Sequence, residues 1–341
     1  MADYDVAIVG GGPTGLVAAI EARLAGLNVV VIEQRDGTID KACGEGLMPG
    51  ALPALERLGV DPVGMPIAGI SYVQGRLRIT HRFSGSPGRG VRRVVLHEAL
   101  ARRAAALGVE RIVARVDAVA QDAHGVVVAG LTARYLLACD GLHSTVAALV
   151  GLSRPAPRRR RRFGIRQHYE LAPWGDTVEI HYARRAEIYV TPISENEIGV
   201  AVLGQRRTDF DRVIAEIPEL ATRLDGVTPA SSRRGAGPFR QRTRARTSGR
   251  VLLVGDASGY VDAITGEGLR LGFAEAQAAI MAVLSDDPAR YEHDWLRITR
   301  DFRLTTSTLV WFATSPLRRA IVPLSVALPG RFGAVVESLA R

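Results

Sequence analysis

At 341 residues, of which 47% are hydrophobic, the chain can fill the core of one large domain or of two closely joined ones, which excludes a disordered or fibrous protein. Its two cysteines, Cys43 and Cys139, provide no disulfide framework, so we expect a reducing, cytoplasmic location. Because Asp3 and Asp5 flank the first apolar residues and no run of about 18 apolar residues follows, we expect neither a signal peptide nor a transmembrane helix.

The net charge of +9 comes almost wholly from arginine, because Lys41 is the only lysine. The densest basic run, residues 158–162, follows Pro155 and Pro157 and contains no aromatic residue. A base-stacking surface would interleave aromatic side chains with the charges. The run therefore predicts a solvated linker and no nucleic-acid partner, although an anionic substrate or a membrane surface would be attracted to it.

The beginning of the chain has the pattern of a β-turn-α-β unit. Residues 4–9 predict a buried strand, residues 10–15 a turn, residues 16–24 a helix that ends at Gly26, and residues 28–32 a second strand. Farther along, apolar spacing predicts a helix over 93–107. Three strands follow it, at residues 111–116, 125–128 and 135–139.

From residue 163 to residue 204 the pattern changes, because polar and apolar residues alternate in extended segments. The expected strands cover residues 165–171, 177–182, 188–191 and 198–202. Turns near residues 173–175 and 195–196 separate them, so we expect an antiparallel sheet.

The last part of the chain returns to the first pattern. Residues 251–254 predict a fully apolar strand, and residues 269–284 predict a helix. Beyond Asp286 we expect further helices. Breaks in them are expected at Pro316, Pro323 and Pro329.

The turn after the first strand carries the spacing G-x-G-x-x-G in Gly10, Gly12 and Gly15. The first glycine permits the tight turn, the second lets backbone approach a pyrophosphate, and the third lets the helix pack closely against the strand. Helix residues from Pro13 onward would direct free N–H groups at the phosphates. Glu33, at the end of the second strand, can accept hydrogen bonds from both ribose hydroxyls. A glycine-rich turn without a ligand is the plain alternative, and either NAD or FAD fits this motif.

A second motif distinguishes between the two dinucleotides. Gly255-Asp256 follows the apolar strand directly, and Gly266 and Gly268 precede the next helix. The carboxylate can hold a ribityl hydroxyl, while N–H groups at the helix start can face a carbonyl-like anion. A flavin needs both contacts, whereas a nicotinamide dinucleotide needs neither. The sequence therefore predicts FAD, with a helix N-cap as the alternative role of Asp256.

These elements predict an α/β fold in which a Rossmann-type FAD-binding domain, a parallel sheet with helices, is interrupted by an antiparallel β-sheet substrate domain and followed by a helical C-terminal tail. We expect the FAD-binding domain to comprise residues 1–65, 93–155 and 240–285. The substrate domain would comprise residues 66–92 and 156–239, and the helical segment residues 286–341.

Together with Asp140-Gly141 and Ser144, the two glycine motifs resemble the three cofactor fingerprints of the para-hydroxybenzoate hydroxylase and geranylgeranyl reductase superfamily of FAD-dependent oxidoreductases. The resemblance covers residues from about 4 to 285. It implies that the first motif holds the ADP half of FAD, that Asp140 lies by the pyrophosphate and the path of the reductant, and that Asp256 binds the ribityl group. Where the family commonly has an arginine, this chain has Ala147, so contact with the reductant or bracing of the motif differs here.

The resemblance also implies that Arg93 touches the middle of the cofactor, with an exposed helix charge as the alternative. The full set of residues expected to bind FAD is Gly10, Gly12, Pro13, Thr14, Gly15, Glu33, Gln34, Arg35, Cys43, Gly44, Arg93, Val116, Asp140, Gly141, Gly255, Asp256, Gly266, Gly268 and Leu269. No metal is expected.

Two loops look like the geranylgeranyl reductase branch, namely Cys43-Gly44-Glu45-Gly46 and the Thr-Gly-Glu-Gly segment that begins at Thr265. The first would lie over the flavin, where Cys43 is either a contact or a structural thiol. Hydroxylases more often have a histidine at the position of Ser258. Halogenases, which are also relatives, need an active-site lysine and a tryptophan-rich motif, and Lys41 stands alone.

Two reactions fit this flavoenzyme. We favour an NAD(P)H-using monooxygenase that hydroxylates an aromatic or polyketide-type hydrophobic small molecule with O₂ through a flavin C4a-hydroperoxide. The alternative is a reductase of isoprenoid carbon–carbon double bonds, and a non-catalytic flavin-binding protein is a third class. The residues proposed as catalytic are Cys43, Glu45, His168, His181 and Tyr189. The histidines and Tyr189, like Thr191, have ordinary half-exposed strand residues as their alternative.

The tail from residue 304 to residue 339 mixes Trp311, Phe312 and Leu324 with Arg318 and Arg319. Such a segment can lie on a membrane surface and collect an apolar substrate. Packing against the preceding domain is the alternative that we favour. The sequence predicts no oligomeric state.

Overall fold

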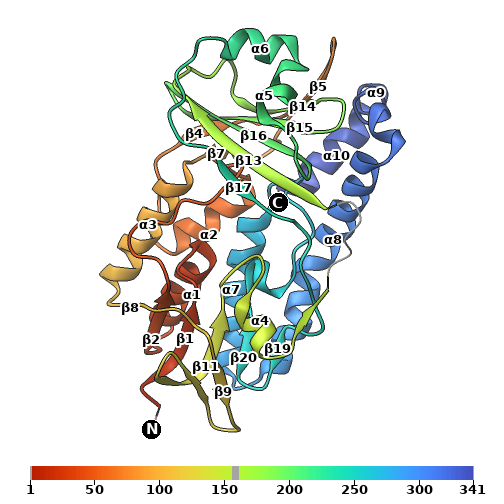
Figure 1. Cartoon of the computed structure of the whole chain (residues 1–341). Helices are drawn as coiled ribbons and strands as arrows, with labels where there is room; N and C mark the ends of the chain where they lie inside the picture. Colours follow the sequence, from red (N-terminus) through yellow and green to blue (C-terminus); the bar gives the residue numbers. More distant parts are fainter. Residues whose placement is uncertain (1, 156–160, 341) are drawn as a thin grey trace.

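The computed structural model describes residues 2–155 and 161–340, and Figure 1 shows a parallel-sheet layer, a second sheet above it and C-terminal helices along one side. Most of the arginine run predicted as a linker lies outside the described residues. Arg162, which is described, is buried in the first strand that follows.

The parallel sheet has the order β19-β20-β11-β1-β2-β8, with β10 and β9 added beside β11. Its strands are β1 (Tyr4–Val9), β2 (Val29–Glu33), β8 (Glu110–Val113), β9 (Val119–Gln121), β10 (Val126–Val128), β11 (Leu131–Ala138), β19 (Thr247–Ser248) and β20 (Val251–Leu253). The pairs β1–β2, β1–β11, β2–β8 and β11–β20 are parallel. Strand β20, far along the sequence, therefore completes a sheet that the first residues begin.

Successive side chains of β1 point to opposite faces of the parallel sheet and enter two different hydrophobic cores. Val6 and Ile8 face the core under the helices, while Ala7 and Val9 face the opposite core beside β9 and β10. The helices over the first face are α1 (Pro13–Leu24), α3 (Arg93–Ala106), α7 (Gly268–Leu284) and α8 (Pro288–Thr314), and the opposite face carries α4 (Thr145–Leu149).

The second sheet has seven strands in the order β17-β13-β16-β15-β14-β5-β6. They are β5 (Gly69–Gln74), β6 (Leu77–Arg82), β13 (Arg162–Tyr169), β14 (Thr177–Tyr182), β15 (Glu187–Ser194), β16 (Glu197–Gln205) and β17 (Arg234–Ala236). All pairs are antiparallel except β14–β5. One face packs against α5 (Phe210–Ala215) and α6 (Pro218–Leu224), and the other against α9 (Ile321–Ala327) and α10 (Pro329–Ala340).

Smaller elements join the two sheets. They are β3 (Gly46–Leu47), β4 (Met65–Ile67), β7 (Gly88–Gly90), β12 (Ser153–Arg154), β18 (Arg242–Thr243), α2 (Leu52–Arg57) and the 3₁₀ helices η1 (Pro49–Ala51), η2 (Gly255–Ser258) and η3 (Pro316–Ala320). Strands β3, β7 and β4 form a three-stranded sheet, and β12 pairs with β18. The architecture confirms the predicted α/β fold with an inserted, largely antiparallel sheet and a helical end.

The predicted break at Pro323 is wrong, because Pro323 is the third residue of α9. The first turn of a helix has N–H groups without intrahelical acceptors, so proline is tolerated there. The breaks at Pro316 and Pro329 are confirmed. Over the described part of the chain, no single helix is long and apolar enough to cross a membrane. The segment Pro316–Ala327 passes that test only together with Pro329–Ala340, across a bend of 104°.

Candidate cofactor and substrate site

The turn between β1 and α1 admits only glycine at two positions. Gly10 has φ +106°, and a Cβ there would lie 2.4 Å from the carbonyl oxygen of Cys139. A Cβ on Gly15 would lie 1.9 Å from the carbonyl oxygen of Gly10. Helix α1 begins at Pro13 with Gly12 as its cap and no side-chain cap. Its first N–H groups are thus left for a phosphate.

Glu33 lies at the end of β2, directly beside this turn. Its Oε2 accepts a hydrogen bond from Gly11 N at 2.9 Å, and its Oε1 accepts one from Arg35 N at 3.0 Å. The backbone thus fixes the carboxylate at the rim of the glycine turn, where a ribose would meet it. Gln34, the next residue, is exposed.

Arg93 and His97 approach the same turn from α3. The Nη2 atom of Arg93 lies 3.7 Å from where a Cβ on Gly12 would be, and its Nε is buried without a hydrogen-bond partner. Burial lowers the pKa of this guanidinium. The alternative of an exposed helix charge is therefore wrong for Arg93. His97, which sequence reasoning missed, lies with Nε2 3.0 Å from the Gly11 carbonyl oxygen and braces the turn.

The Gly255-Asp256 motif contacts the glycine turn between β1 and α1. A Cβ on Gly255 would lie 2.9 Å from Cγ2 of Thr14, so the two turns are in contact. Gly255 N donates to Glu275 Oε2 at 2.7 Å, which holds the turn on α7. Asp256 lies within η2 and caps neither η2 nor α7, so its alternative role as a helix N-cap is wrong. Burial raises the pKa of Asp256, while the charges of Lys41 and Arg93 oppose this shift.

Asp140 and Gly141 follow β11 at the same edge of the sheet. Asp140 Oδ2 accepts from Val146 N at 3.0 Å, and its Oδ1 is buried without a partner. A Cβ on Gly141 would lie 3.9 Å from Lys41 Nζ, so the two face one another. Ala147, where the family commonly has arginine, is buried in the core and donates its N–H to Ser144 Oγ at 2.9 Å. That position braces the motif and does not reach outward.

Gln241 joins two cofactor motifs and was missed by sequence reasoning. Its Oε1 accepts from His143 N and from Ser144 N, the latter at 3.3 Å. Its Nε2 donates to the carbonyl oxygens of Asp256 at 2.8 Å and Ala257 at 3.0 Å. One amide side chain therefore fixes the spacing between the Asp-Gly and Gly-Asp turns. No local pattern around residue 241 indicates this role.

The remaining cofactor candidates are two glycines near the start of α7 and two apolar residues. Gly266, with φ +71°, has open space where a Cβ would be, and Gly268 starts α7 with its Cβ position 3.9 Å from Asp256 Oδ1. Leu269, next in α7, packs against the core under the helices, and Val116 is buried in the core on the opposite face of the parallel sheet. The ring of Tyr260 meets Phe239 edge-on at 5.9 Å.

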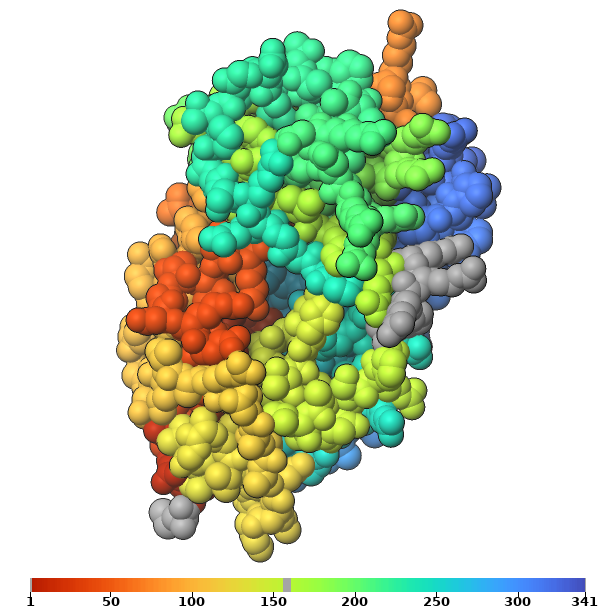
Figure 2. All heavy atoms as spheres, viewed as in Figure 1, coloured from red at the N-terminus to blue at the C-terminus, as the bar shows by residue number. Residues whose placement is uncertain are grey.

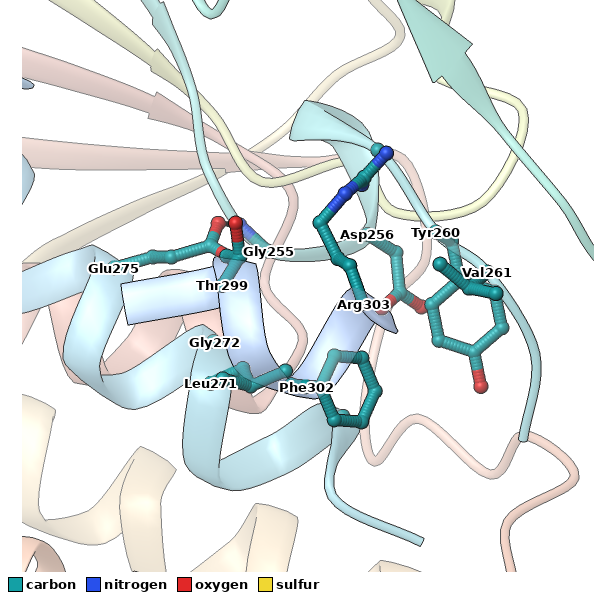
Figure 3. Close-up of a pocket in the computed structure, with 12 residues that line it drawn as sticks. Gly255, Asp256, Tyr260, Val261, Leu271, Gly272, Glu275, Thr299, Phe302 and Arg303 are labelled. Atoms are coloured by element: carbon teal, nitrogen blue, oxygen red, sulfur yellow. Dashed lines mark hydrogen bonds between the residues drawn. The ribbon is translucent and has the colours of Figure 1, made fainter. Parts of the chain in front are cut away.

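A pocket beside η2 extends the site toward α8. Figure 3 shows Asp256, Tyr260 and Arg303 around it, with Glu275 on the far side. Within the described residues Arg303 has no ion-pair partner, and burial lowers its pKa. Figure 2 shows a hollow in the face turned to the viewer, between segments coloured orange-red and yellow-green. Glycine turns, an unpartnered Arg93 Nε and an unpartnered Asp140 Oδ1 line one region, so these residues fit a flavin dinucleotide.

The loop before β3 lies between the cofactor residues and the second sheet. Cys43 is half-buried, its Sγ lies 3.4 Å from Glu45 N, and burial raises the pKa of its thiol. The carbonyl oxygen of Gly44 accepts a hydrogen bond from Thr191 Oγ1 at 2.9 Å. Glu45 adopts φ +60°, which is uncommon for a residue with a side chain. The bond from Thr191 thus ties this part of the loop to β15.

Glu45 and His168, which are 123 positions apart, form a buried pair. Glu45 Oε1 accepts from Arg93 N at 2.8 Å, and its Oε2 is hydrogen-bonded to His168 Nε2. On the other side of the imidazole, His168 Nδ1 lies 2.7 Å from Ser231 Oγ and 3.2 Å from Arg166 Nη1. A continuous polar chain thus runs from the helix beside the glycine turn into the second sheet.

The other two candidates lie apart from this chain. His181 Nε2 is 2.9 Å from Glu179 Oε2, a carboxylate that also pairs with Arg78. All of these residues belong to the second sheet, and the structure does not bring His181 to the cofactor motifs. Tyr189 donates from its hydroxyl to the carbonyl oxygen of Ile264 at 2.9 Å, and burial raises its pKa well above the ordinary value.

The fold and site together define a dinucleotide-binding flavoprotein with a second, largely antiparallel sheet. The FAD binding domain family matches residues 3–285, so the chain belongs to that family and FAD is its cofactor. This confirms the superfamily that the three fingerprints predicted.

The named relatives include monooxygenases and lipid reductases. The chain is 29% identical to rifampicin monooxygenase of Streptomyces venezuelae over 301 residues, which cover 80% of this chain and 62% of that protein. It is 24% identical to digeranylgeranylglycerophospholipid reductase of Methanococcus aeolicus, covering 80% of this chain and 74% of that protein. The chain thus spans about three fifths of the length of the monooxygenase. A flavoprotein/dehydrogenase from Cytophaga hutchinsonii superposes with a TM-score of 0.85 at 19% identity, covering 98% of this chain and 92% of that one, which shows the shared fold.

Proposed function

We propose that the protein is an FAD-dependent monooxygenase that uses NAD(P)H and O₂ to hydroxylate a hydrophobic aromatic small molecule. The observation that carries the proposal is the buried chain from Arg93 through Glu45 and His168 to Ser231, which links the cofactor side to the second sheet. A phenol is activated when a base removes its proton. His168, held by Glu45, would take that proton through the hydroxyl of the half-buried Ser231, which lies 2.7 Å from its Nδ1. The 29% identity to a monooxygenase supports the same class.

The chain would hold FAD with the residues described above. The turn from Gly10 to Gly15 and Glu33 would bind the ADP half, and Asp256 with the start of α7 would bind the flavin half. Arg93 would neutralise the pyrophosphate. Bound FAD would supply the hydride and oxygen chemistry, while the protein positions the substrate and excludes water.

A reductase of isoprenoid double bonds is the second candidate, on a specific observation. The loop with Cys43 and Glu45 and the segment with Glu267 lie at the cofactor site, and a lipid reductase is among the relatives. The pKa of Glu267 is raised by burial to about 7, against a partial opposing effect of Arg270, which suits a group that gives up a proton near neutrality. Flavin-dependent halogenases share the fold, but the only lysine, Lys41, faces Gly141 and no tryptophan-rich motif accompanies it, so we keep this alternative below the other two.

One experiment separates the two candidates. Purified protein with FAD is incubated with NADPH or NADH and with phenolic or prenyl compounds, with and without O₂, and with ¹⁸O₂ as a label. A monooxygenase yields product only with oxygen, and one labelled oxygen atom enters the product. Turnover that continues without oxygen would refute the proposal and support the reductase.

A further inference from the structure

The corner between α9 and α10 exposes apolar side chains. Leu324 is 51% exposed, Val326 39% and Leu328 44%. They belong to residues 321–330, a segment without a single charged residue. Figure 1 places α9 at the right-hand edge of the molecule, away from the glycine turn. We call residues 321–331 the apolar corner.

The charged residues next to the apolar corner in the sequence all have one sign. Arg319 precedes it and Arg331 ends it, and both are exposed. Neither forms an ion pair within the described residues. Acidic residues are missing from the whole stretch 302–336. Water therefore meets apolar side chains framed by unpaired positive charge, which is the composition of a segment that binds an anionic interface.

The residues on the inner side of the apolar corner are fixed by contacts with the second sheet. Arg318 is buried, forms an ion pair with Glu187 and donates from Nε to the carbonyl oxygen of Ala183 at 3.1 Å. In α10, Glu337 pairs with His81 at 2.8 Å, and the ring of Phe332 lies 4.8 Å from that of Tyr72. The inner sides of these helices are thus anchored on the second sheet. Their outer corner is the part left uncovered.

We propose that the apolar corner docks on the surface of an anionic lipid bilayer, with Leu324, Val326 and Leu328 entering the boundary between headgroups and acyl chains and with Arg319 and Arg331 at the lipid phosphates. Burial of apolar side chains drives the attachment, at about 25 cal/mol per Å² removed from water. Each arginine adds about 1 kcal/mol near an anionic surface. The attachment to the membrane is peripheral, because the inner sides of α9 and α10 remain packed on the second sheet.

Vesicle flotation of the full chain with FAD bound tests the proposal. Vesicles of phosphatidylcholine alone are compared with vesicles that contain phosphatidylglycerol, at low and high salt. We expect binding to anionic vesicles that weakens at high salt without vanishing, since only the electrostatic part is screened. The double variant Leu324→Ser/Leu328→Ser should bind at least about tenfold less. Arg319→Gln/Arg331→Gln should lose the preference for anionic vesicles.

A matched control removes two exposed valines elsewhere. Val113 is 54% and Val127 48% exposed, and both lie on strands of the parallel sheet. Val113→Ser/Val127→Ser should float like the parent protein. The proposal is overturned if the parent protein stays off all vesicles, if high salt abolishes its binding completely, or if both serine pairs reduce flotation equally. It is also overturned if light scattering shows a dimer that Leu324→Ser/Leu328→Ser makes monomeric, since a second copy would then cover the corner.

Discussion

At the nucleotide end of the site, the turn from Gly10 to Gly15, backbone atoms approach one another so closely that no side chain fits. At the proposed substrate end, around Glu45 and His168, buried polar side chains instead hold separate layers of the protein together. A Cβ on Gly15 would meet the Gly10 carbonyl at 1.9 Å. Glu45 and His168, by contrast, join a loop to a strand through their side chains. The first arrangement tolerates no added atom, and the second depends on charge and protonation. Mutations at the two ends should therefore fail in different ways.

The largest effect is expected from Gly15→Ala. The added methyl cannot fit without moving the turn, so we expect at least about 3 kcal/mol lower free energy of unfolding and loss of bound FAD. Absorbance at the flavin band per mole of protein and thermal denaturation measure both quantities. Gly175→Ala is the control, because its Cβ position has no atom within 4 Å. A yellow, stable Gly15→Ala protein would show that the turn is not built by close approach.

Next is the substrate end, where two buried histidines offer a matched pair. His168→Gln should lower kcat by about 100-fold with FAD content unchanged, since it removes the group proposed as base. His181→Gln should change kcat less than about threefold, because that histidine pairs with Glu179 within the sheet. Both side chains are fully buried, so both variants carry similar folding costs. Equal kcat losses in the two variants would contradict the assignment.

The connection between the Asp-Gly and Gly-Asp cofactor turns is tested by Gln241→Leu. This change keeps the shape and leaves unpaired the backbone groups that Gln241 holds, at a cost of about 2 kcal/mol in unfolding free energy. Because Gln241 no longer fixes the distance between the Asp-Gly and Gly-Asp turns, the affinity for FAD should fall about tenfold. Titration of the apoprotein by flavin fluorescence measures it. Gln74→Leu is the control, since the buried Oε1 of Gln74 has no partner to lose.

The smallest effect concerns pH. Burial raises the pKa of Glu275 from 4.5 to about 8, so the folded state binds its proton more tightly than the unfolded state does. The stability from this group is complete below about pH 4.5 and is lost as pH rises through about 8. Glu275→Gln keeps both hydrogen bonds, to Gly255 N and Ser258 Oγ. The variant should therefore lose less stability than the parent protein between pH 5 and pH 8 in denaturant titrations.

Much of the nucleotide end could be predicted from the sequence because its signals are local. The spacing of Gly10, Gly12 and Gly15 and the period of β1 lie within a few residues of one another. The pairing of Glu45 with His168 joins distant positions, and each residue became a candidate on separate grounds. No local sequence pattern around Gln241 indicates its role in joining the two cofactor turns.

The start of α9 before Pro323 was missed, and the burial of Arg93 was indicated only by the family resemblance, for a related reason. The position where α9 starts is set by the ion pair between Arg318 and Glu187. Arg93 is covered by the glycine turn between β1 and α1. Local propensity cannot indicate either arrangement, because tertiary contacts decide it.

The position of β20 has a consequence for synthesis. A ribosome that has released the first 155 residues has made β1, β2, β8 and β11, but the edge of β11 that β20 later covers is still open. An apolar, unpaired strand edge is a template for wrong pairing with another chain. Nascent chains should thus need protection by a chaperone until residue 253 emerges, and fragments that stop before it should aggregate.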